Sequence, residues 1–214
     1  MSLRPCPWMP DTLQLAPVPF QPQSLLVLLH GWGSNALDMA VLAQALCPLV
    51  PGALALAPQG FETTSAQPGA RQWFDVNGMT PANRAQRVAL ALPRLVQWLR
   101  DAQQGTDVPP ERTVLAGFSQ GASLAVELAL AHDGLVSRVL AFAGRCATPP
   151  EQAPKRTALH FLLGAADPLI SAEQAQATVE RLRALGGEAT LDLAAGLGHG
   201  IDAALLDAAV RRLA

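Results

Sequence analysis

The chain has 214 residues, of which 50% are hydrophobic and 15% are charged, and its formal net charge is −2 at pH 7. This composition is typical of a packed globular protein and argues against disorder and against a nucleic-acid-binding surface. The small net charge indicates no strongly charged partner.

The length suits one domain, so we expect residues 1–214 to form a single unit, with 1–20 as an N-terminal extension or an edge segment. The first residues, Met1 to Asp11, include three prolines and no long apolar run. No stretch of the chain reaches the roughly eighteen apolar residues of a membrane span. We therefore expect a cytoplasmic protein without stable membrane insertion.

Three cysteines, Cys6, Cys47 and Cys146, are widely spaced, and no Cys-x-x-Cys or Cys/His cluster accompanies them. This spacing predicts neither structural disulfides nor a metal site. Cys146 has no evident base near it in the sequence, so a small buried residue is favoured over a reactive thiol.

Short apolar runs typical of buried strands alternate along the chain with segments of helical pattern. The runs are Ser24 to Leu29, Ala53 to Ala57, Thr113 to Ala116, Val139 to Ala143, Ala158 to Leu163 and Ala189 to Leu193. Alternating strands and helices predict an α/β fold with a mostly parallel central sheet flanked by helices.

The connections and helix starts are also readable. The irregular segment Pro58 to Gly78 is long for a connection, which makes it a candidate wall of a substrate site. A helix is expected from Thr80, with Pro81 in its first turn, to about Gln103, and Pro93 predicts a kink or a break within it. Ser171 and Gln174 have the spacing of a capping box.

Residues Gly117-Phe118-Ser119-Gln120-Gly121 follow one of the apolar runs and precede an alanine- and leucine-rich helical stretch. They form the pattern Gly-x-Ser-x-Gly at a strand-to-helix turn, where a strained backbone exposes the serine hydroxyl. The small residues at both ends let the strand and the helix approach closely. Ser119 is therefore the candidate nucleophile.

A serine hydroxyl is a weak nucleophile, so it requires a general base held by a carboxylate. His199 lies on a glycine-flanked loop after the last predicted strand and is the expected base. His160 falls inside a strand, where a hydrogen-bonded core histidine is the better interpretation. His132 is expected at the end of the helix that follows Ser119, where an imidazole interacts well with the helix dipole.

Asp167 follows the run Ala158 to Leu163, which places it at the carboxyl edge of the predicted sheet, where α/β proteins bind ligands. The alternative is that Asp167-Pro168 only begins a turn. Asp192 is the main rival acid but lies within a strand, and Asp202 is expected in the closing helix. The order Ser119, Asp167, His199 is the order of α/β-hydrolases.

The oxyanion hole is expected from backbone amides. His30-Gly31-Trp32-Gly33 forms a glycine-rich turn after the first strong strand, and the Gln120 amide is the expected second donor. A nucleotide-binding loop is the competing interpretation of these glycines, but a full Gly-x-Gly-x-x-Gly is not convincingly present.

Five motifs together resemble the phospholipase/carboxylesterase family, which includes the acyl-protein thioesterases, and within it the small bacterial carboxylesterases. They are Leu29-His30-Gly31-Trp32-Gly33, Arg71-Gln72-Trp73-Phe74-Asp75, Gly117-Phe118-Ser119-Gln120-Gly121, Asp167-Pro168 and Gly198-His199-Gly200-Ile201. The resemblance spans residues 24 to 213. It implies an α/β-hydrolase fold without a large cap domain, no cofactor, and a monomer or homodimer.

The resemblance also implies a Ser119-His199-Asp167 triad, oxyanion donors at the amides of Trp32 and Gln120, and hydrolysis of acyl esters or thioesters. Many family members have a small aliphatic residue where this chain has Trp32, so short to medium acyl chains are expected. Trp73 and Phe74 are candidates for the pocket wall, although an aromatic pair is more often ordinary packing. The alternatives are an acyl- or ester-binding protein without turnover, and an amidase or peptidase with the same triad.

Overall fold

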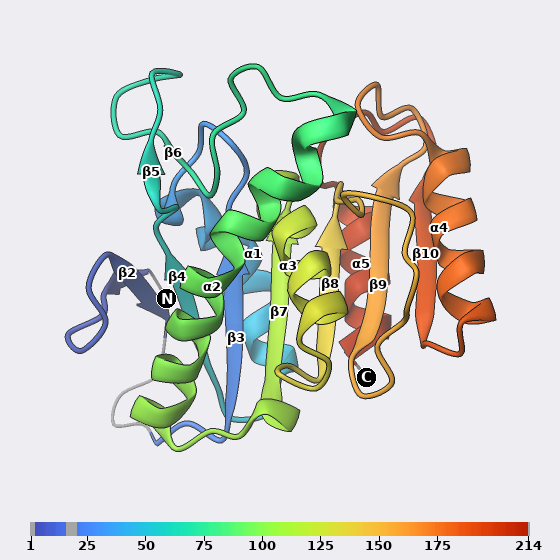
Figure 1. Ribbon diagram of the computed structural model, residues 1–214. Helices are drawn as coiled ribbons and strands as arrows, with labels where there is room; N and C mark the ends of the chain where they lie inside the picture. Colours follow the sequence, from blue (N-terminus) through green and yellow to red (C-terminus); the bar gives the residue numbers. More distant parts are fainter. Residues whose placement is uncertain (1–2, 16–20, 214) are drawn as a thin grey trace.

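The computed structural model describes residues 3–15 and 21–213; the rest of the expected N-terminal segment 1–20 lies outside the described residues. An eight-stranded sheet forms its centre (Figure 1). Its strands, in spatial order, are β1 (Arg4–Pro5), β2 (Thr12–Leu15), β4 (Ala53–Pro58), β3 (Ser24–Leu29), β7 (Thr113–Phe118), β8 (Arg138–Phe142), β9 (Ala158–Gly164) and β10 (Ala189–Ala194).

The strands from β4 to β10 in this order run parallel, whereas β1 and β2 form an antiparallel edge beside β4. All six strands predicted from apolar runs are present, with ends that differ by at most two residues from the expected ones. A separate two-stranded ribbon, β5 (Glu62–Thr63) and β6 (Arg71–Gln72), lies within the segment expected to be irregular. The fold is an α/β-hydrolase fold without a large cap.

Helices cover both faces of the sheet (Figure 1). The α-helices are α1 (Ala40–Leu46), α2 (Pro81–Thr106), α3 (Gln120–Ala131), α4 (Ala172–Ala184) and α5 (Ala203–Leu213), and the 3₁₀-helices are η1 (Ala36–Met39), η2 (Cys47–Leu49) and η3 (Pro110–Arg112). Helices α2, α3 and α4 pack on one face, and α1 and α5 pack on the other.

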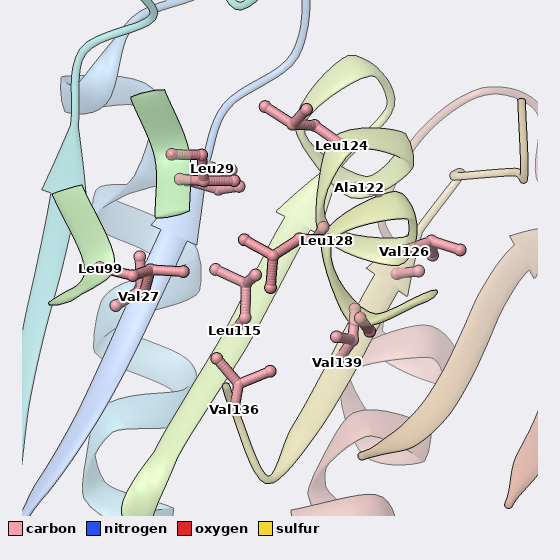
Figure 2. Packing of buried hydrophobic residues seen from close by; sticks show 14 of the residues in the cluster. Val27, Leu29, Leu99, Leu115, Ala122, Leu124, Val126, Leu128, Val136 and Val139 are labelled. Atoms are coloured by element: carbon pink, nitrogen blue, oxygen red, sulfur yellow. The ribbon is translucent and has the colours of Figure 1, made fainter. Parts of the chain in front are cut away.

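The core around α3 shows why the central strands are rigid. Figure 2 shows Leu115 of β7 beside Leu128 of α3, with Val27 of β3 and Leu99 of α2 nearby. All four side chains are fully buried. Truncating such a leucine to alanine costs about 2–5 kcal/mol, so the end of β7 that carries Ser119 is held firmly.

The helix starts agree largely with the sequence. Pro81 is the first residue of α2, and the Ser171 hydroxyl accepts the Gln174 backbone N–H at 3.3 Å. Among the described residues, the Gln174 side chain does not return a bond to the Ser171 backbone N–H, so only half of the capping box is formed, and the Ser171 hydroxyl also donates to Glu173 at 2.6 Å. The sequence predicted a kink or a break of the helix at Pro93, and the break is wrong. Helix α2 runs through this residue, whose exposed ring leaves the buried face of the helix intact.

Candidate active site

Ser119 lies at the turn from β7 into α3 and has an unusual backbone conformation. Its φ is 52° and its ψ is −109°, a region that costs a non-glycine residue about 1–3 kcal/mol. The Ser119 N–H donates to the Phe142 carbonyl at 2.8 Å, and the Ser119 carbonyl accepts from Ser123 at 2.9 Å. These bonds and the packed strand hold the strained turn, which presents the hydroxyl to His199.

The glycines two positions either side of Ser119 are required by close packing. A Cβ at Gly117 would lie 2.6 Å from the Ala122 nitrogen, and one at Gly121 would lie 2.4 Å from the Leu29 carbonyl oxygen. Both distances are far below van der Waals contact. Any larger residue would push α3 away from β3 and β7 and displace the serine.

His199 lies on the loop between β10 and α5 and faces the serine. The Ser119 hydroxyl donates to His199 Nε2 at 2.9 Å, and His199 Nδ1 donates to Asp167 Oδ2 at 2.7 Å. Because an ionised carboxylate is only an acceptor, Nδ1 carries the proton and Nε2 presents its lone pair to the hydroxyl. The Phe118 ring packs against the imidazole at 5.2 Å and limits its rotation.

Asp167 lies on the loop after β9, and its side chain has no solvent-exposed area. While Oδ2 accepts from His199, Oδ1 accepts the backbone N–H groups of Leu169 at 2.8 Å and Ile170 at 3.1 Å. Both oxygens are therefore occupied by donors, which makes burial of this carboxylate tolerable and fixes its rotation.

The other histidines do not approach the serine. His160 is inside β9 with Nδ1 2.9 Å from the Thr190 hydroxyl, and burial lowers its pKa to about 4, so it is neutral. His132 is the C-terminal cap of α3.

The rival acids are used elsewhere. Asp192 pairs with Arg212 through oxygens at 2.9 and 3.2 Å. Asp202 immediately precedes α5 and accepts the Leu205 N–H at 2.9 Å, so it caps that helix.

The amides of Trp32 and Gln120 have the properties that oxyanion donors need. Gln120 is the residue after Ser119, at the first position of α3, and Trp32 lies on the turn after β3, the strand paired with β7. Neither N–H donates a hydrogen bond to another group in residues 3–15 and 21–213. Both residues line the same cavity as Ser119 and His199.

His30 holds the turn that carries Trp32. The Gly60 N–H donates to His30 Nε2 at 2.8 Å, so the proton is on Nδ1, which donates to the Gly31 carbonyl at 2.7 Å. Burial is the main cause that lowers the pKa of His30, which agrees with a neutral ring. The sequence placed His30 in the oxyanion motif but did not indicate this structural role.

Trp73 does not line the cavity, and this expectation is corrected. Its side chain is only 1% exposed, its indole N–H donates to the His30 carbonyl at 2.8 Å, and its ring packs on the His30 imidazole. A buried indole needs a partner for its N–H, and the carbonyl end of β3 supplies one. The neighbouring Phe74 does line the cavity.

The Gln120 side chain joins the same segment to the elbow. Its Oε1 accepts the Trp73 N–H at 2.9 Å, and its Nε2 donates to the Phe74 carbonyl at 2.7 Å. The loop that carries Phe74 is thus tied directly to the first turn of α3. Of the long segment Pro58 to Gly78, Phe74 and Val76 form part of the cavity wall.

Ser119 opens into a cavity of about 790 Å³, within the range of small-molecule sites. Its wall is mainly apolar, with side chains from the η1–α1 region, from α2 and from the loops after β9 and β10. The apolar lining residues larger than alanine are Trp32, Met39, Val41, Leu42, Phe74, Val76, Met79, Val88, Phe118, Leu169, Ile170, Ile201 and Leu206.

Two arginines, Arg84 and Arg145, also line this cavity, and sequence reasoning assigned neither a role. Arg84 is on the first turn of α2, and Arg145 follows the carboxyl end of β8. The signal for Arg145 was its place just after a parallel strand, at the edge where α/β proteins bind ligands.

A strained serine on a strand-to-helix turn, with a histidine and an aspartate on later loops of a mostly parallel sheet, defines an α/β-hydrolase. A family model described as Phospholipase/Carboxylesterase matches residues 18–214. The chain belongs to this family and is an ester hydrolase.

Individual proteins agree with this assignment. The chain is 42% identical over 180 residues to Esterase YpfH of Escherichia coli strain K12, covering 84% of this chain and 77% of that protein. The crystal structure of esterase PE8 superposes with a TM-score of 0.86 at 28% identity, covering 100% of this chain and 98% of that one. A carboxylesterase from Mesorhizobium loti shares the fold, with a TM-score of 0.80 at 20% identity and 97% of each chain covered.

Within the described ranges 3–15 and 21–213, none of the helices has the length and apolar character needed to cross a membrane. The same ranges contain no group of three or more His, Cys, Asp or Glu side chains arranged to hold a metal ion.

Proposed function

We propose that this protein is a serine carboxylesterase that hydrolyses esters or thioesters of short to medium acyl chains through a covalent acyl-enzyme. The observation that carries this proposal is the continuous hydrogen-bonded row from Ser119 through His199 to Asp167, with distances of 2.9 and 2.7 Å, at an apolar cavity. A nucleophile must lie within hydrogen-bond distance of its base, and the Ser119 hydroxyl and His199 Nε2 meet this requirement without a substrate.

In the first half-reaction, His199 Nε2 takes the Ser119 proton while the serine oxygen attacks the acyl carbon. The carbonyl oxygen becomes an oxyanion between the amides of Trp32 and Gln120. The protonated imidazole then gives its proton to the leaving alcohol or thiol, and the acyl group stays on Ser119. Asp167 remains ionised and stabilises the imidazolium.

In the second half-reaction, His199 removes a proton from a water molecule as the water oxygen attacks the acyl carbon. The imidazolium then gives this proton to the Ser119 oxygen as the bond between that oxygen and the acyl carbon breaks, and the acid product leaves. Two backbone donors already aimed at the oxyanion need no reorganisation. Losing one such donor in related chemistry costs about 3–4 kcal/mol, so the two amides are the largest contribution that we assign.

The preference for short to medium chains rests on Trp32. Its indole is 47% exposed at the cavity and is held by a bond from its N–H to Gln72 Oε1 at 3.0 Å. A fixed indole at this place takes up space that a longer acyl chain would need. In Trp32→Ala the amide donor is kept, and we expect the ratio of kcat/KM for laurate over butyrate to rise about tenfold.

The test is hydrolysis of p-nitrophenyl esters from acetate to laurate by the wild type, Ser119→Ala and Trp32→Ala, with matched thioesters and anilides beside them. Turnover that requires Ser119 and prefers esters supports the proposal. Absence of turnover would favour the binding-protein alternative, and faster cleavage of the anilide than of the ester would favour an amidase.

A further inference from the structure

Arg84 and Arg145 bring two positive charges to an otherwise apolar cavity. They come from distant parts of the chain, the first turn of α2 and the loop after β8, yet both line the cavity that contains Ser119 and His199. The Arg145 backbone N–H donates to the Ser123 hydroxyl at 3.2 Å, which ties this loop to α3. Both side chains are half-buried.

Neither guanidinium is paired with a carboxylate of the part of the chain that the structure describes. Within residues 3–15 and 21–213, no carboxylate lies within 4.0 Å of either group, whereas Arg87, one turn further along α2, pairs with Asp75 at 3.3 Å. The Arg145 Nη1 donates to the Leu169 carbonyl at 3.3 Å, and the Arg84 side chain makes no hydrogen bond within those ranges. Most of their donors are therefore available to a ligand.

The surroundings add positive charge at this end of the cavity and do not compensate it. Burial, and next the positive charge of Arg145, lower the pKa of Arg84. The amino end of α2 adds partial positive charge beside Arg84. Among the described residues that line the cavity, the acidic one is Asp38. It is not paired with either arginine, and its Oδ2 accepts from the Ser34 hydroxyl at 2.6 Å and from the Asn35 N–H at 3.3 Å.

We propose that Arg84 and Arg145 form an anion subsite that selects esters carrying a carboxylate or phosphate group. The inference rests on the proposed function, because it names the substrate class of the same site. Guanidinium groups bind both anions through paired N–H donors, and the apolar wall beside them accommodates the carbon chain that links the anion to the ester. The two arginines are specificity-determining residues rather than part of the proton transfer.

The experiment compares charged and neutral esters in two sets. In the carboxylate set, the mono-p-nitrophenyl ester of adipic acid is compared with its methyl ester. In the phosphate set, 4-(butyryloxy)phenyl phosphate is compared with 4-methoxyphenyl butyrate. The readout is the ratio of kcat/KM for the charged over the neutral ester, because the intrinsic reactivity of each substrate cancels when proteins are compared.

We expect this ratio to fall about tenfold or more from wild type to Arg84→Met/Arg145→Met in at least one set, and that set identifies the anion. Arg84→Lys/Arg145→Lys keeps the charge and should retain part of the ratio. Salt at about 0.5 M should lower the wild-type ratio by screening. Arg100 and Arg112 are exposed, and Arg100→Met/Arg112→Met, which loses the same charge, should leave the ratio unchanged.

A ratio that stays within about twofold of wild type in both sets, while neutral esters are hydrolysed in a Ser119-dependent way, overturns the anion subsite alone. Absence of turnover of every ester, with no labelling of Ser119 by a fluorophosphonate, overturns the proposed function and the subsite with it. If Arg84→Met/Arg145→Met does not fold by circular dichroism, the single variants and the lysine pair decide the question by the same ratio.

Discussion

Replacing Asp167 by asparagine should trap His199 in the wrong tautomer. The single amide oxygen of the variant must take the place of either Oδ1 or Oδ2. Oδ1 accepts two backbone N–H groups, from Leu169 at 2.8 Å and Ile170 at 3.1 Å, and an NH₂ group there would face two donors. The oxygen therefore stays with the loop, and the NH₂ faces His199 Nδ1.

An NH₂ at this position donates to Nδ1 and forces the imidazole proton onto Nε2, which then has no lone pair for the Ser119 proton. In serine hydrolases this wrong tautomer lowers kcat by about 10⁴, equivalent to about 5.5 kcal/mol of transition-state stabilisation. We expect a loss of that size in Asp167→Asn, with KM changed by less than about threefold because Asp167 does not contact substrate. Hydrolysis of p-nitrophenyl butyrate measures both constants.

Asp192→Asn is the matched control, since Asp192, on β10, pairs with Arg212 of α5 and does not contact His199. Its activity should stay within about twofold of wild type, and circular dichroism should show both variants folded. Asp167→Asn with more than a tenth of wild-type kcat, or an equal loss in Asp192→Asn, would refute the reasoning.

Three further predictions concern side chains outside the proton transfer. In Gln120→Ala, the Trp73 N–H and the Phe74 carbonyl lose their partners, which should lower the free energy of unfolding in urea by about 2–5 kcal/mol; a change below about 1 kcal/mol would contradict this. Burial lowers the pKa of His160 from 6.5 to about 4, so the stability that its neutral form contributes is complete above pH 6.5 and is lost as the pH falls toward 4. Between pH 7 and 4.5, the free energy of unfolding should therefore fall by about 2–3 kcal/mol more in wild type than in His160→Asn, and equal slopes would show that His160 is not responsible. Burial, and next the charge of Glu127, raise the pKa of Cys146 to about 12, so iodoacetamide at pH 7.5 should label its peptide far more slowly in the folded protein than in urea; similar rates would contradict the burial.

Most of the parallel strands were readable from the sequence because they are buried on both faces, so runs such as Ser24 to Leu29 contain almost no polar residue. The shortest strands were not readable, since β1 and β5 have two residues each and exist through pairing with a neighbour. The break expected at Pro93 does not occur. The buried side chains of α2 on both sides of the proline, among them Val88 and Leu95, outweigh the one lost backbone bond.

In the site, too, local sequence signals predicted some residues, whereas others depend on tertiary contacts that the sequence does not show. The positions of Ser119 and His199 follow from local signals, namely a strand-to-helix turn and a glycine-flanked loop. Trp73 was assigned to the pocket wall because nothing in the sequence shows that its indole N–H pairs with a carbonyl at the end of β3. Arg145 lies in no motif. That it lines the same cavity as Arg84 depends on how α2 crosses the sheet, which the sequence does not show.

The central claim is that Ser119 is the nucleophile, and mass spectrometry of the acylated protein tests it most directly. Wild-type protein is mixed with a p-nitrophenyl ester or a fluorophosphonate, quenched in acid and digested, beside Ser119→Ala. We predict one acyl or phosphonyl adduct, on the peptide that contains Ser119, and none in the variant. An adduct on another residue, or ester hydrolysis that persists in Ser119→Ala, would contradict it.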